Sequence, residues 1–588
     1  MSKYVIISRR GSGIMKVFKK IGLLTMLLIL VSCQGVNNSS NESSKNNSTT
    51  VSSTSKNSSA SSSSTSTNKE SSTSTSTNKE SSTSTSTNKE SSSSITSSSN
   101  SVVSSSTPVI RAPSVSTPEV DDNEPKLIDI YATNDLHGRI SSGTSYVPGI
   151  ARLSTYLKQK KAENEDGFIY INSGDYWQDT YESGYNKGKL LTECLDVLEC
   201  ETLSYGNHEF DWGIDTIKEN LQYTSYTTFL GANIREYPNT DKIVDFAEPY
   251  KIVERDGLKI GIIGAIGKGQ ITSITSSNWE DITFLDHAPV VKELSDELRS
   301  EKDCDIVILS IHADEADSAG SEITKVSPVT NKKYVDAVFC AHSHQREIKY
   351  YNEVPFVQAG QHGQNLSHVT LQYFEGEVEV LKAEHEHGFR TMSQCFPDPE
   401  IEDIINKYFT EEYFNDKDKV HGTISGSGSM DKATSGNLLA KATYEKLQEE
   451  GVEVDIVINN GSRDSVSVGT MTSEKIFNMI PFTNKTIVAR NIKGQDIINE
   501  CVNYTNYYYM PDPTLKINSN SYYTVACIDY LLLHKSTNRN YNYFSSYKES
   551  NVIYTIEEYC NSIVEWYLQK HGTVAKTDFS GTNYNCLK

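Results

Sequence analysis

Short apolar runs rich in β-branched residues recur along the middle of this chain, and a polar cluster follows each of them. Runs of this length and composition are typical of buried β-strands rather than helices. Four of them occupy residues 126–132, 167–172, 305–311 and 335–340. We interpret them as strands of an α/β sheet, a fold in which the loops at the strand ends gather the chemistry.

The polar clusters, four after these runs and a fifth at 206–213, are built mainly from aspartate, asparagine and histidine. A single Asp-x-His pair is more often a turn or a surface pair than a metal site, but five clusters of this kind argue against coincidence. Together they supply the candidate ligands Asp135, His137, Asp175, Asn207, His312, His342 and His344. Oxygen and imidazole donors suit divalent Zn, Mn, Fe or Co. A set of this size fits two metal ions better than one.

The beginning of the chain has the pattern of a secreted lipoprotein. Lys16, Lys19 and Lys20 precede an apolar run at 21–31 that is too short to span a membrane and is typical of a signal peptide. Leu-Val-Ser-Cys, ending at Cys33, resembles a bacterial lipobox. We therefore expect lipidation at Cys33 and an extracellular, membrane-anchored protein at the cell surface. The alternative is a plain secretory signal with an incidental cysteine.

Residues 34–125 consist almost entirely of Ser, Thr, Asn, Lys and Glu, and a ten-residue segment at 71–80 is repeated at 81–90. Such a composition cannot bury apolar surface, so we expect this segment to be disordered. A flexible chain of this length has an average end-to-end distance of about 50 Å. We interpret it as a tether that holds a folded enzyme away from the membrane.

Charge and cysteine content restrict the classes of partner and the covalent framework. The formal net charge of −21 argues against binding of nucleic-acid polymers. It does not exclude nucleotides, because bound metals supply positive charge locally. The cysteines after Cys33 show no motif spacing, so we expect no disulfide framework, although a single Cys560–Cys586 bond remains open.

The polar clusters, including Gly-Asn-His-Glu at 206–209, resemble those of the calcineurin-like metallophosphoesterases, and among them the 5'-nucleotidase and UDP-sugar hydrolase family. Further segments at 149–154, 256–264 and 358–361 match the same family, and the resemblance extends over residues 126–543. It implies an α/β fold, with an N-terminal four-layer α/β/β/α metallophosphoesterase sandwich and a smaller α/β C-terminal 5'-nucleotidase domain.

The resemblance also implies a role for each candidate residue. Asp175 would bridge two divalent ions, between which a water becomes the nucleophile. His208 would bind the phosphoryl oxygens and stabilise charge, and Asp211 would orient its imidazole. Two sets of three side chains would complete the two metal sites: Asp135, His137 and His344 in the first, and Asn207, His312 and His342 in the second.

The C-terminal half resembles the family less closely. Its substrate loop, ending at Arg463, is one residue shorter than the family's, Thr434 stands where some members have an arginine, and residues 538–543 replace a glycine-rich loop. Tyr541 is the expected base-stacking residue, with Tyr508 as a substitute. The predicted substrate-binding residues are Asn437, Asn459, Arg463 and Tyr541.

Composition and resemblance together predict a signal peptide (1–33), a tether (34–125), a catalytic domain (126–395), a linker helix (396–415) and a C-terminal substrate-binding domain (416–588). We expect a metal-dependent 5'-nucleotidase that releases phosphate and a nucleoside. The alternatives are a UDP-sugar hydrolase, a nucleotide pyrophosphatase or a 2',3'-cyclic phosphodiesterase with the same metals. A surface binding protein or adhesin on a stalk is the alternative outside enzymes. The sequence leaves the oligomeric state open.

Overall fold

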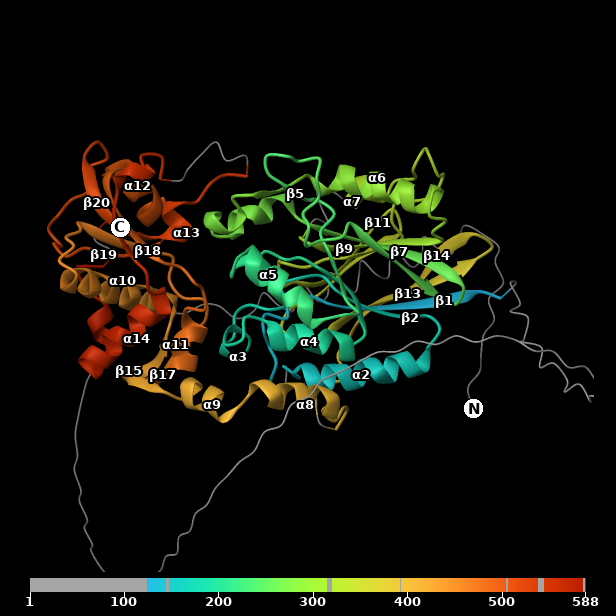
Figure 1. Ribbon diagram of the computed structural model, residues 1–588, viewed down its shortest axis with the longest axis horizontal. Helices are drawn as coiled ribbons and strands as arrows, with labels where there is room; N and C mark the ends of the chain where they lie inside the picture. Colours follow the sequence, from blue (N-terminus) through green and yellow to red (C-terminus); the bar gives the residue numbers. More distant parts are fainter. Residues whose placement is uncertain are drawn as a thin grey trace, which may run out of the picture. The chain divides into compact units, whose positions relative to one another are not determined.

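The apolar runs predicted as strands do form strands in the computed structural model (Figure 1). Their boundaries differ from the predicted ones by one or two residues, as is usual for strand ends. The four strands are β1 (Lys126–Thr133), β2 (Phe168–Asn172), β9 (Ile306–His312) and β10 (Ala337–Phe339).

The structure describes residues 124–588 with the exception of 144–146, 315–319, 392, 504–505, 538–543, 585–586 and 588. The predicted signal peptide, Cys33 and residues 34–123 of the predicted tether lie outside the described residues, as do Tyr541 and Cys586. The described residues belong to one unit of the chain, Pro113–Lys588. None of the helices formed by them is both long enough and apolar enough to cross a lipid bilayer.

Two six-stranded sheets organise the first half of this unit. The first has the order β14-β13-β1-β2-β3-β4, in which β1 to β4 run parallel and β13 and β14 are antiparallel additions. Its remaining strands are β3 (Cys200–Ser204), β4 (Thr228–Leu230), β13 (Leu366–Phe374) and β14 (Glu377–Glu386). Parallel neighbours bring the carboxyl ends of β1, β2 and β3 to one edge of the sheet.

The second sheet has the order β11-β12-β10-β9-β7-β6, with β7, β9, β10 and β12 parallel. Its other strands are β6 (Tyr250–Arg255), β7 (Leu258–Ile266), β11 (Arg346–Tyr351) and β12 (Val354–Ala359). A separate antiparallel pair is formed by β5 (Ile234–Glu236) and β8 (Ile282–Phe284).

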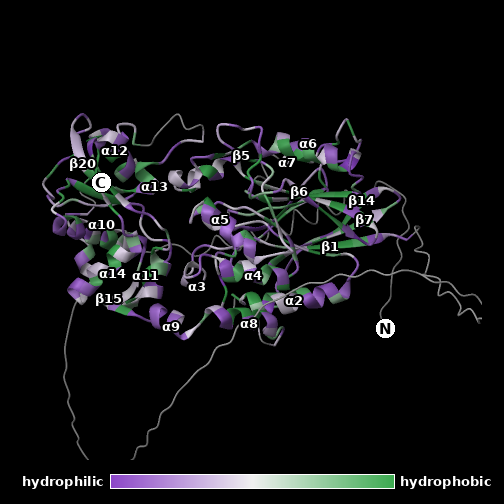
Figure 2. Ribbon diagram, viewed as in Figure 1, coloured by the Kyte–Doolittle hydropathy of each residue, from purple (hydrophilic) through white to green (hydrophobic). Residues whose placement is uncertain are grey.

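Alternation along the strands explains the layered packing. Ile128 and Ile130 of β1 pack against Ile262 and its neighbours on the second sheet, whereas Tyr131 lies on the opposite face in a core shared with helices. A third core joins the second sheet to α6. Together the three cores give the four-layer α/β/β/α sandwich that was predicted. In Figure 2, β1 is hydrophobic along much of its length, while α2 mixes hydrophobic and hydrophilic positions.

The helices of this half lie in the connections between the strands. They include a long helix after the first polar cluster and another before β9, together with shorter ones. Their boundaries are α2 (Ile150–Glu163), α3 (Tyr181–Gly184), α4 (Lys189–Val197), α5 (Ile214–Asn220), α6 (His287–Ser300) and α7 (Gly320–Ile323).

Two helices occupy the segment predicted as a linker helix. In α8 (Pro399–Tyr408), Pro399 stands in the first turn, and the Asp398 side chain accepts a hydrogen bond from the Glu400 backbone N–H. A proline in the first turn and an aspartate cap both favour the start of a helix at this place. A second helix, α9 (Glu411–Lys417), begins directly after the short connection at 409–410 and continues past the predicted segment.

The C-terminal half has its own hydrophobic core, formed by helices α10 and α14 and the strands beside them. Its two sheets have the orders β17-β15-β22 and β19-β16-β20-β18-β21. The strands are β15 (Val420–Met430), β16 (Ile456–Asn459), β17 (Val466–Thr472), β18 (Thr486–Lys493), β19 (Tyr507–Tyr509), β20 (Tyr522–Ile528), β21 (Val552–Ile556) and β22 (Thr573–Ala575). The helices are α10 (Lys432–Glu449), α11 (Ser473–Met479), α12 (Gly494–Ile498), α13 (Asp529–Leu532) and α14 (Cys560–His571).

Candidate active site

The candidate ligands follow or end the strands of both sheets. Asp135 and His137 lie just after β1, Asp175 after β2, and Asn207 after β3. His312 is the last residue of β9 in the second sheet. Shortly after β10 come His342 and His344. Residues separated by more than 200 positions thus meet at the edges where the parallel strands end.

The backbone at this site adopts a left-handed conformation that residues other than glycine rarely adopt. Five of the candidate ligands have positive φ angles, a region populated by only a few per cent of non-glycine residues. The angles are 48° at Asp135, 51° at His137, 53° at Asp175, 74° at His342 and 58° at His344. Strain of this kind persists where surrounding structure holds it, and it concentrates at functional sites.

The first group of ligand candidates consists of Asp135, His137 and His344. The Nε2 atoms of His137 and His344 face each other at 2.9 Å. A carboxylate oxygen of Asp135, Oδ1, lies 3.8 Å from Nε2 of His137 and 3.4 Å from Nε2 of His344. Two imidazole nitrogens that converge on a carboxylate are a donor set suited to a divalent cation.

The second group consists of Asn207, His312 and His342. The amide oxygen of Asn207 lies 3.1 Å from Nδ1 of His342. Asp175 stands between the groups, because its Oδ2 is 3.1 Å from Nε2 of His312 and 3.9 Å from Nε2 of His137. This is where a carboxylate that serves two ions would have to lie.

His312 gives the clearest test of whether the residues fit a metal. Its Nδ1 donates a hydrogen bond to the backbone carbonyl of Ser173 at 2.9 Å, which leaves Nε2 as the ring nitrogen that faces Asp175. Nε2 is fully buried and lies 3.1 Å from Oδ2 of Asp175, without good hydrogen-bond geometry to any described residue. Burial opposes protonation of His312, but Asp175 raises its pKa to about 9, so a metal ion at this position would replace the Nε2 proton. The residues present therefore fit divalent metal.

Glycines and one buried glutamate hold the loops that carry these ligands. At Gly206, a Cβ would lie 2.2 Å from Oδ1 of Asp175, so no larger residue fits there. Glu209 accepts hydrogen bonds from the backbone N–H groups of Asp175 (2.9 Å), Tyr176 (2.7 Å) and Gly206 (2.7 Å). Burial and the charge of Asp175 raise the pKa of Glu209 to about 7. The hydrogen bonds to three backbone N–H groups explain why a glutamate ends the Gly-Asn-His-Glu motif, a role that was not predicted from the sequence.

His208 and Asp211 form a buried pair beside the ligand groups. Nδ1 of His208 lies 2.6 Å from Oδ2 of Asp211, one turn further along the chain. Burial opposes protonation of His208, but Asp211 and Asp175 outweigh it and raise its pKa to about 10. Because Asp211 occupies Nδ1, the other ring nitrogen, Nε2, is the one left for a ligand.

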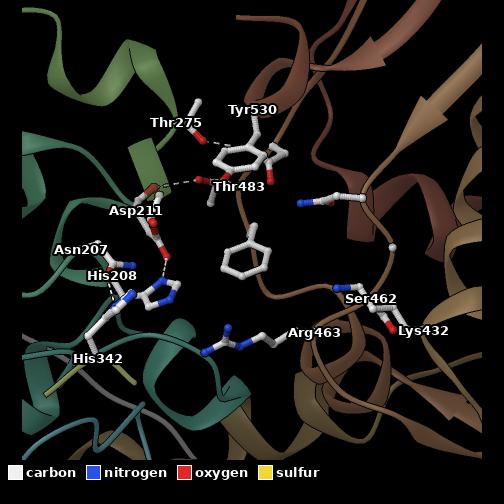
Figure 3. Close-up of a pocket in the computed structure, with 15 residues that line it drawn as sticks. Asn207, His208, Asp211, Thr275, His342, Lys432, Ser462, Arg463, Thr483 and Tyr530 are labelled. Atoms are coloured by element: carbon white, nitrogen blue, oxygen red, sulfur yellow. Dashed lines mark hydrogen bonds and ion pairs between the residues drawn. The ribbon is translucent and has the colours of Figure 1, made fainter. Parts of the chain in front are cut away.

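A pocket of about 260 Å³ adjoins these residues (Figure 3). One side is lined by residues of the first half, and the other by four segments of the C-terminal half, two loops and the starts of α10 and α13. The lining residues that bear on function are Asn207, His208, Asp211, His342, Lys432, Arg463, Phe482 and Tyr530. The guanidinium group of Arg463 points toward His208 and His342 in Figure 3.

Two aromatic rings give this pocket a surface suited to a flat ligand. The ring of Phe482 is nearly parallel to that of His208, at 16° and a centroid distance of 5.9 Å. Tyr530, at the start of α13, lines the same pocket. Neither Phe482 nor Tyr530 was among the residues predicted from the sequence to bind substrate.

The four residues predicted to bind substrate differ in where they lie relative to the pocket. Arg463 lines the pocket. Asn437 and Asn459 do not, because both amides are buried and donate to backbone carbonyls, of Phe579 and Gly436 respectively. Tyr541 is outside the described residues. Its suggested substitute, Tyr508, is 1 % exposed within the C-terminal core, so the idea that it stacks on a base is wrong.

The eight described cysteines, all buried, form no disulfide bond: Cys194, Cys200, Cys304, Cys340, Cys395, Cys501, Cys527 and Cys560. Burial raises the pKa of the Cys304 thiol to about 11, as expected for a small buried hydrophobic residue. The Cys560–Cys586 bond that the sequence left open stays untested, since Cys586 is outside the described residues.

Comparison with known families and proteins agrees with this architecture. Residues 128–346 match the family model of the calcineurin-like phosphoesterases, and residues 419–503 match that of the 5'-nucleotidase C-terminal domain. An apyrase from Tabanus yao is 32% identical over 410 residues, which cover 62% of this chain and 69% of that protein. Endonuclease YhcR from Bacillus subtilis is 26% identical over 397 residues, covering 63% of this chain but only 32% of its own length.

The fold also resembles solved structures. The crystal structure of a 5'-nucleotidase precursor from Thermus thermophilus superimposes with a TM-score of 0.62 at 18% identity, covering 76% of this chain and 97% of that one. Fold and comparisons thus define a calcineurin-like metallophosphoesterase, a class of phosphoester hydrolases that use divalent metals. Within this class, the chain belongs to the 5'-nucleotidase family. This places it among enzymes rather than among the surface binding proteins considered above.

Proposed function

We propose that this chain is a two-metal 5'-nucleotidase that converts a nucleoside monophosphate into phosphate and a nucleoside. The observation that carries the proposal is the continuity of one pocket. It joins the ligand candidates Asn207 and His342 to an arginine, Arg463, and to the aromatic rings of Phe482 and Tyr530. Metal ligands, a phosphate-binding cation and flat apolar surfaces are what a nucleotide requires.

The proposed metal sites use the two groups of side chains described above. Asp135, His137 and His344 would hold one ion, Asn207, His312 and His342 the other, and Asp175 would serve both. When bound, two divalent ions activate water for attack on phosphorus and neutralise charge on the phosphate. The family supplies the expectation of divalent metal, and the buried Nε2 of His312, which faces Asp175 without good hydrogen-bond geometry, supports it from this chain's own structure.

The chain's own residues would then orient the phosphate and stabilise charge. His208, held through Nδ1 by Asp211, would present Nε2–H to a phosphoryl oxygen or to the departing nucleoside oxygen. Arg463 would add a charge-assisted hydrogen bond from the other side of the pocket. Donors fixed in place before the reaction stabilise the transition state without reorganisation, and each contributes several kcal/mol, roughly 2.7–4.

Phosphate release from a substrate panel tests this proposal. Purified protein lacking the signal peptide is assayed with 5'-mononucleotides, nucleotide sugars and 2',3'-cyclic nucleotides, with and without added Mn²⁺ or Zn²⁺. We expect metal-dependent phosphate release from the 5'-mononucleotides. Cleavage confined to nucleotide sugars or cyclic nucleotides would replace the proposed activity with that of a pyrophosphatase or a phosphodiesterase.

We also propose that the enzyme is held at the outer face of the cell by lipid on Cys33. The charged segment, the short apolar run and Leu-Val-Ser-Cys occur in the order of a lipoprotein signal. The Ser- and Thr-rich tether would then carry the catalytic unit away from the membrane. The proposed division places catalytic residues in 126–395, a linker in 396–415 and a substrate-binding domain in 416–588.

A further inference from the structure

Asp179 is a buried carboxylate beside the candidate metal site to which the sequence analysis gave no role. It lies four residues beyond Asp175 in the loop after β2, and it is 3% exposed. Its φ angle is 113°, which is a glycine-like conformation. An aspartate in such a backbone is strained, so an observed outlier of this kind justifies asking what the side chain does.

One oxygen of Asp179 faces two functional groups at once. Its Oδ2 accepts a hydrogen bond from Nε of Arg463 at 2.8 Å and forms an ion pair with Nη2 of the same guanidinium at 2.7 Å. The same oxygen lies 3.3 Å from Nδ1 of His137, whose Nε2 points at the first ligand group. Within the described residues, Nδ1 of His137 has no hydrogen-bond partner of good geometry.

The pairing fixes one edge of the guanidinium and leaves the other edge for a ligand. Arg463 comes from the loop after β16 in the C-terminal half, whereas Asp179 belongs to the first half. Nε is hydrogen-bonded and Nη2 ion-paired to Asp179, whereas Nη1 makes no hydrogen bond within the described part of the chain, and Arg463 lines the pocket. An arginine held through these two contacts keeps its remaining donors in a defined direction.

We propose that Asp179 is a positioning residue that acts in two directions, orienting the imidazole of His137 and holding Arg463 with its free edge toward the substrate phosphate. This inference rests on the proposed function, since it takes His137 as a metal ligand and Arg463 as a phosphate-binding residue. A carboxylate behind a ligating histidine orients the ring and raises its basicity. Here the same carboxylate also brings a cation of the C-terminal half to the metal centre.

A second contact across the two halves offers a matched comparison. Arg139 and Asp464 form an ion pair at 3.3 Å, with side chains 25% and 48% exposed. Within the described part of the chain, Asp464 has no hydrogen bond or ion pair with a candidate ligand, and it does not line the pocket. If Asp179 merely fastened the two halves together, removing Asp464 would have an effect of the same kind. If Asp179 positions functional groups, the two substitutions differ.

The test compares Asp179→Gly, Asp179→Asn and Asp464→Asn in the protein lacking only its signal peptide. Glycine suits the φ angle of 113° without strain, so loss of function in Asp179→Gly is not a backbone defect. Mn²⁺ affinity and orthophosphate affinity are measured by calorimetry, together with kcat and KM for a 5'-mononucleotide. We expect both Asp179 variants to bind Mn²⁺ about 10- to 100-fold more weakly, while Asp464→Asn is unchanged.

A double-mutant cycle with Arg463→Ala tests whether Asp179 affects phosphate binding through Arg463. At saturating Mn²⁺, Asp179→Gly and Arg463→Ala should each weaken orthophosphate binding about tenfold or more, and the double variant should bind no more weakly than Arg463→Ala alone. Additive losses in phosphate affinity, or unchanged Mn²⁺ affinity in both Asp179 variants, would overturn the inference. Failure of the proposed function is a separate result, because the unaltered protein would then release no phosphate from any mononucleotide.

Discussion

The position of His208 is compatible with two roles, as a metal ligand or as a catalytic residue that contacts the phosphate. One of its ring nitrogens, together with ligand atoms of His137 and Asp175, falls within a group whose atoms all lie within 4.8 Å of one another. Its Nδ1, however, is committed to Asp211 at 2.6 Å. A histidine bound in this way is arranged to hold a proton at Nε2, so we place it against the phosphate rather than on a metal.

Substituting His208 distinguishes these two roles. We expect His208→Ala to keep its bound metal and to lose about 10²–10⁴-fold in kcat, the usual contribution of a positioned acid or charge-stabilising group. Asp211→Asn should lose less, because the imidazole stays while its orientation weakens. Elemental analysis beside initial rates provides the measurement. Loss of a metal equivalent from His208→Ala would make His208 a ligand.

At the scale of elements, the substrate pocket depends on two short segments of the C-terminal half. Phe482 lies between α11 and β18, and Tyr530 lies in the first turn of α13. Loss of a ring that stacks on a base costs about 1–3 kcal/mol. Phe482→Ala and Tyr530→Ala should therefore raise KM for nucleotides about 5- to 150-fold while leaving hydrolysis of a small aryl phosphate nearly unchanged.

The exposed Tyr522, at 62% exposure and outside the pocket, is the matched control for these substitutions. Tyr522→Ala should leave both substrates unaffected. Equal losses on nucleotide and aryl phosphate in the Phe482 and Tyr530 variants would mean that the rings support the fold and do not contact the base.

Three neighbouring strands share a buried charge network remote from the pocket. On β13, Nε2 of His368 lies 2.8 Å from Oδ1 of Asp129 on β1, and its Nδ1 lies 2.9 Å from Oε1 of Glu386 on β14. Burial works against the charge on both carboxyls, but His368 and other hydrogen-bond donors outweigh it and lower the pKa of each to about 2. Burial likewise opposes the charge on His368, and the two carboxylates raise its pKa above 6.5.

These shifts fix the pH dependence of stability. The carboxyls stabilise the fold above their ordinary pKa values of 3.8 and 4.5, and this contribution is lost as the pH falls toward about 2. The raised pKa of His368 stabilises the fold below 6.5, and this contribution is lost as the pH rises through the folded-state value. We expect His368→Gln to lower the free energy of unfolding by about 1–3 kcal/mol, most strongly between about pH 5 and 6.5. Urea unfolding from pH 3 to 9 measures this, and a difference that does not vary with pH would contradict it.

At the scale of the whole molecule, anchoring is predicted from sequence alone, because Cys33 lies outside the described residues. Cys33→Ser should leave the protein unlipidated, so that it appears in the medium or accumulates as precursor. Mass spectrometry of the mature N-terminus and fractionation of cells provide the measurement. An unchanged membrane fraction with no lost lipid mass would show that Cys33 carries no anchor.

Features that a short stretch of sequence determines were predicted, whereas features that depend on contacts between distant residues were not. The strands before Asp135, Asp175 and His312 were predictable because apolar runs of this length are specific, and the polar clusters carry a family resemblance. Asp179 and Tyr530 were not, since their roles arise from contacts with residues hundreds of positions away in the chain. Asn437 and Asn459 were placed by resemblance alone, whereas their burial depends on how α10 and β16 pack.

The central claim is that Asp175 joins two metal ions in one hydrolytic centre, and metal content measured beside turnover tests it most directly. We predict that the unaltered protein binds two divalent ions per chain and loses nucleotide hydrolysis on chelation, because both ligand groups meet at Asp175. Asp175→Ala should retain at most one ion and have no measurable turnover. An Asp175→Ala variant with two bound ions and normal turnover would contradict the account.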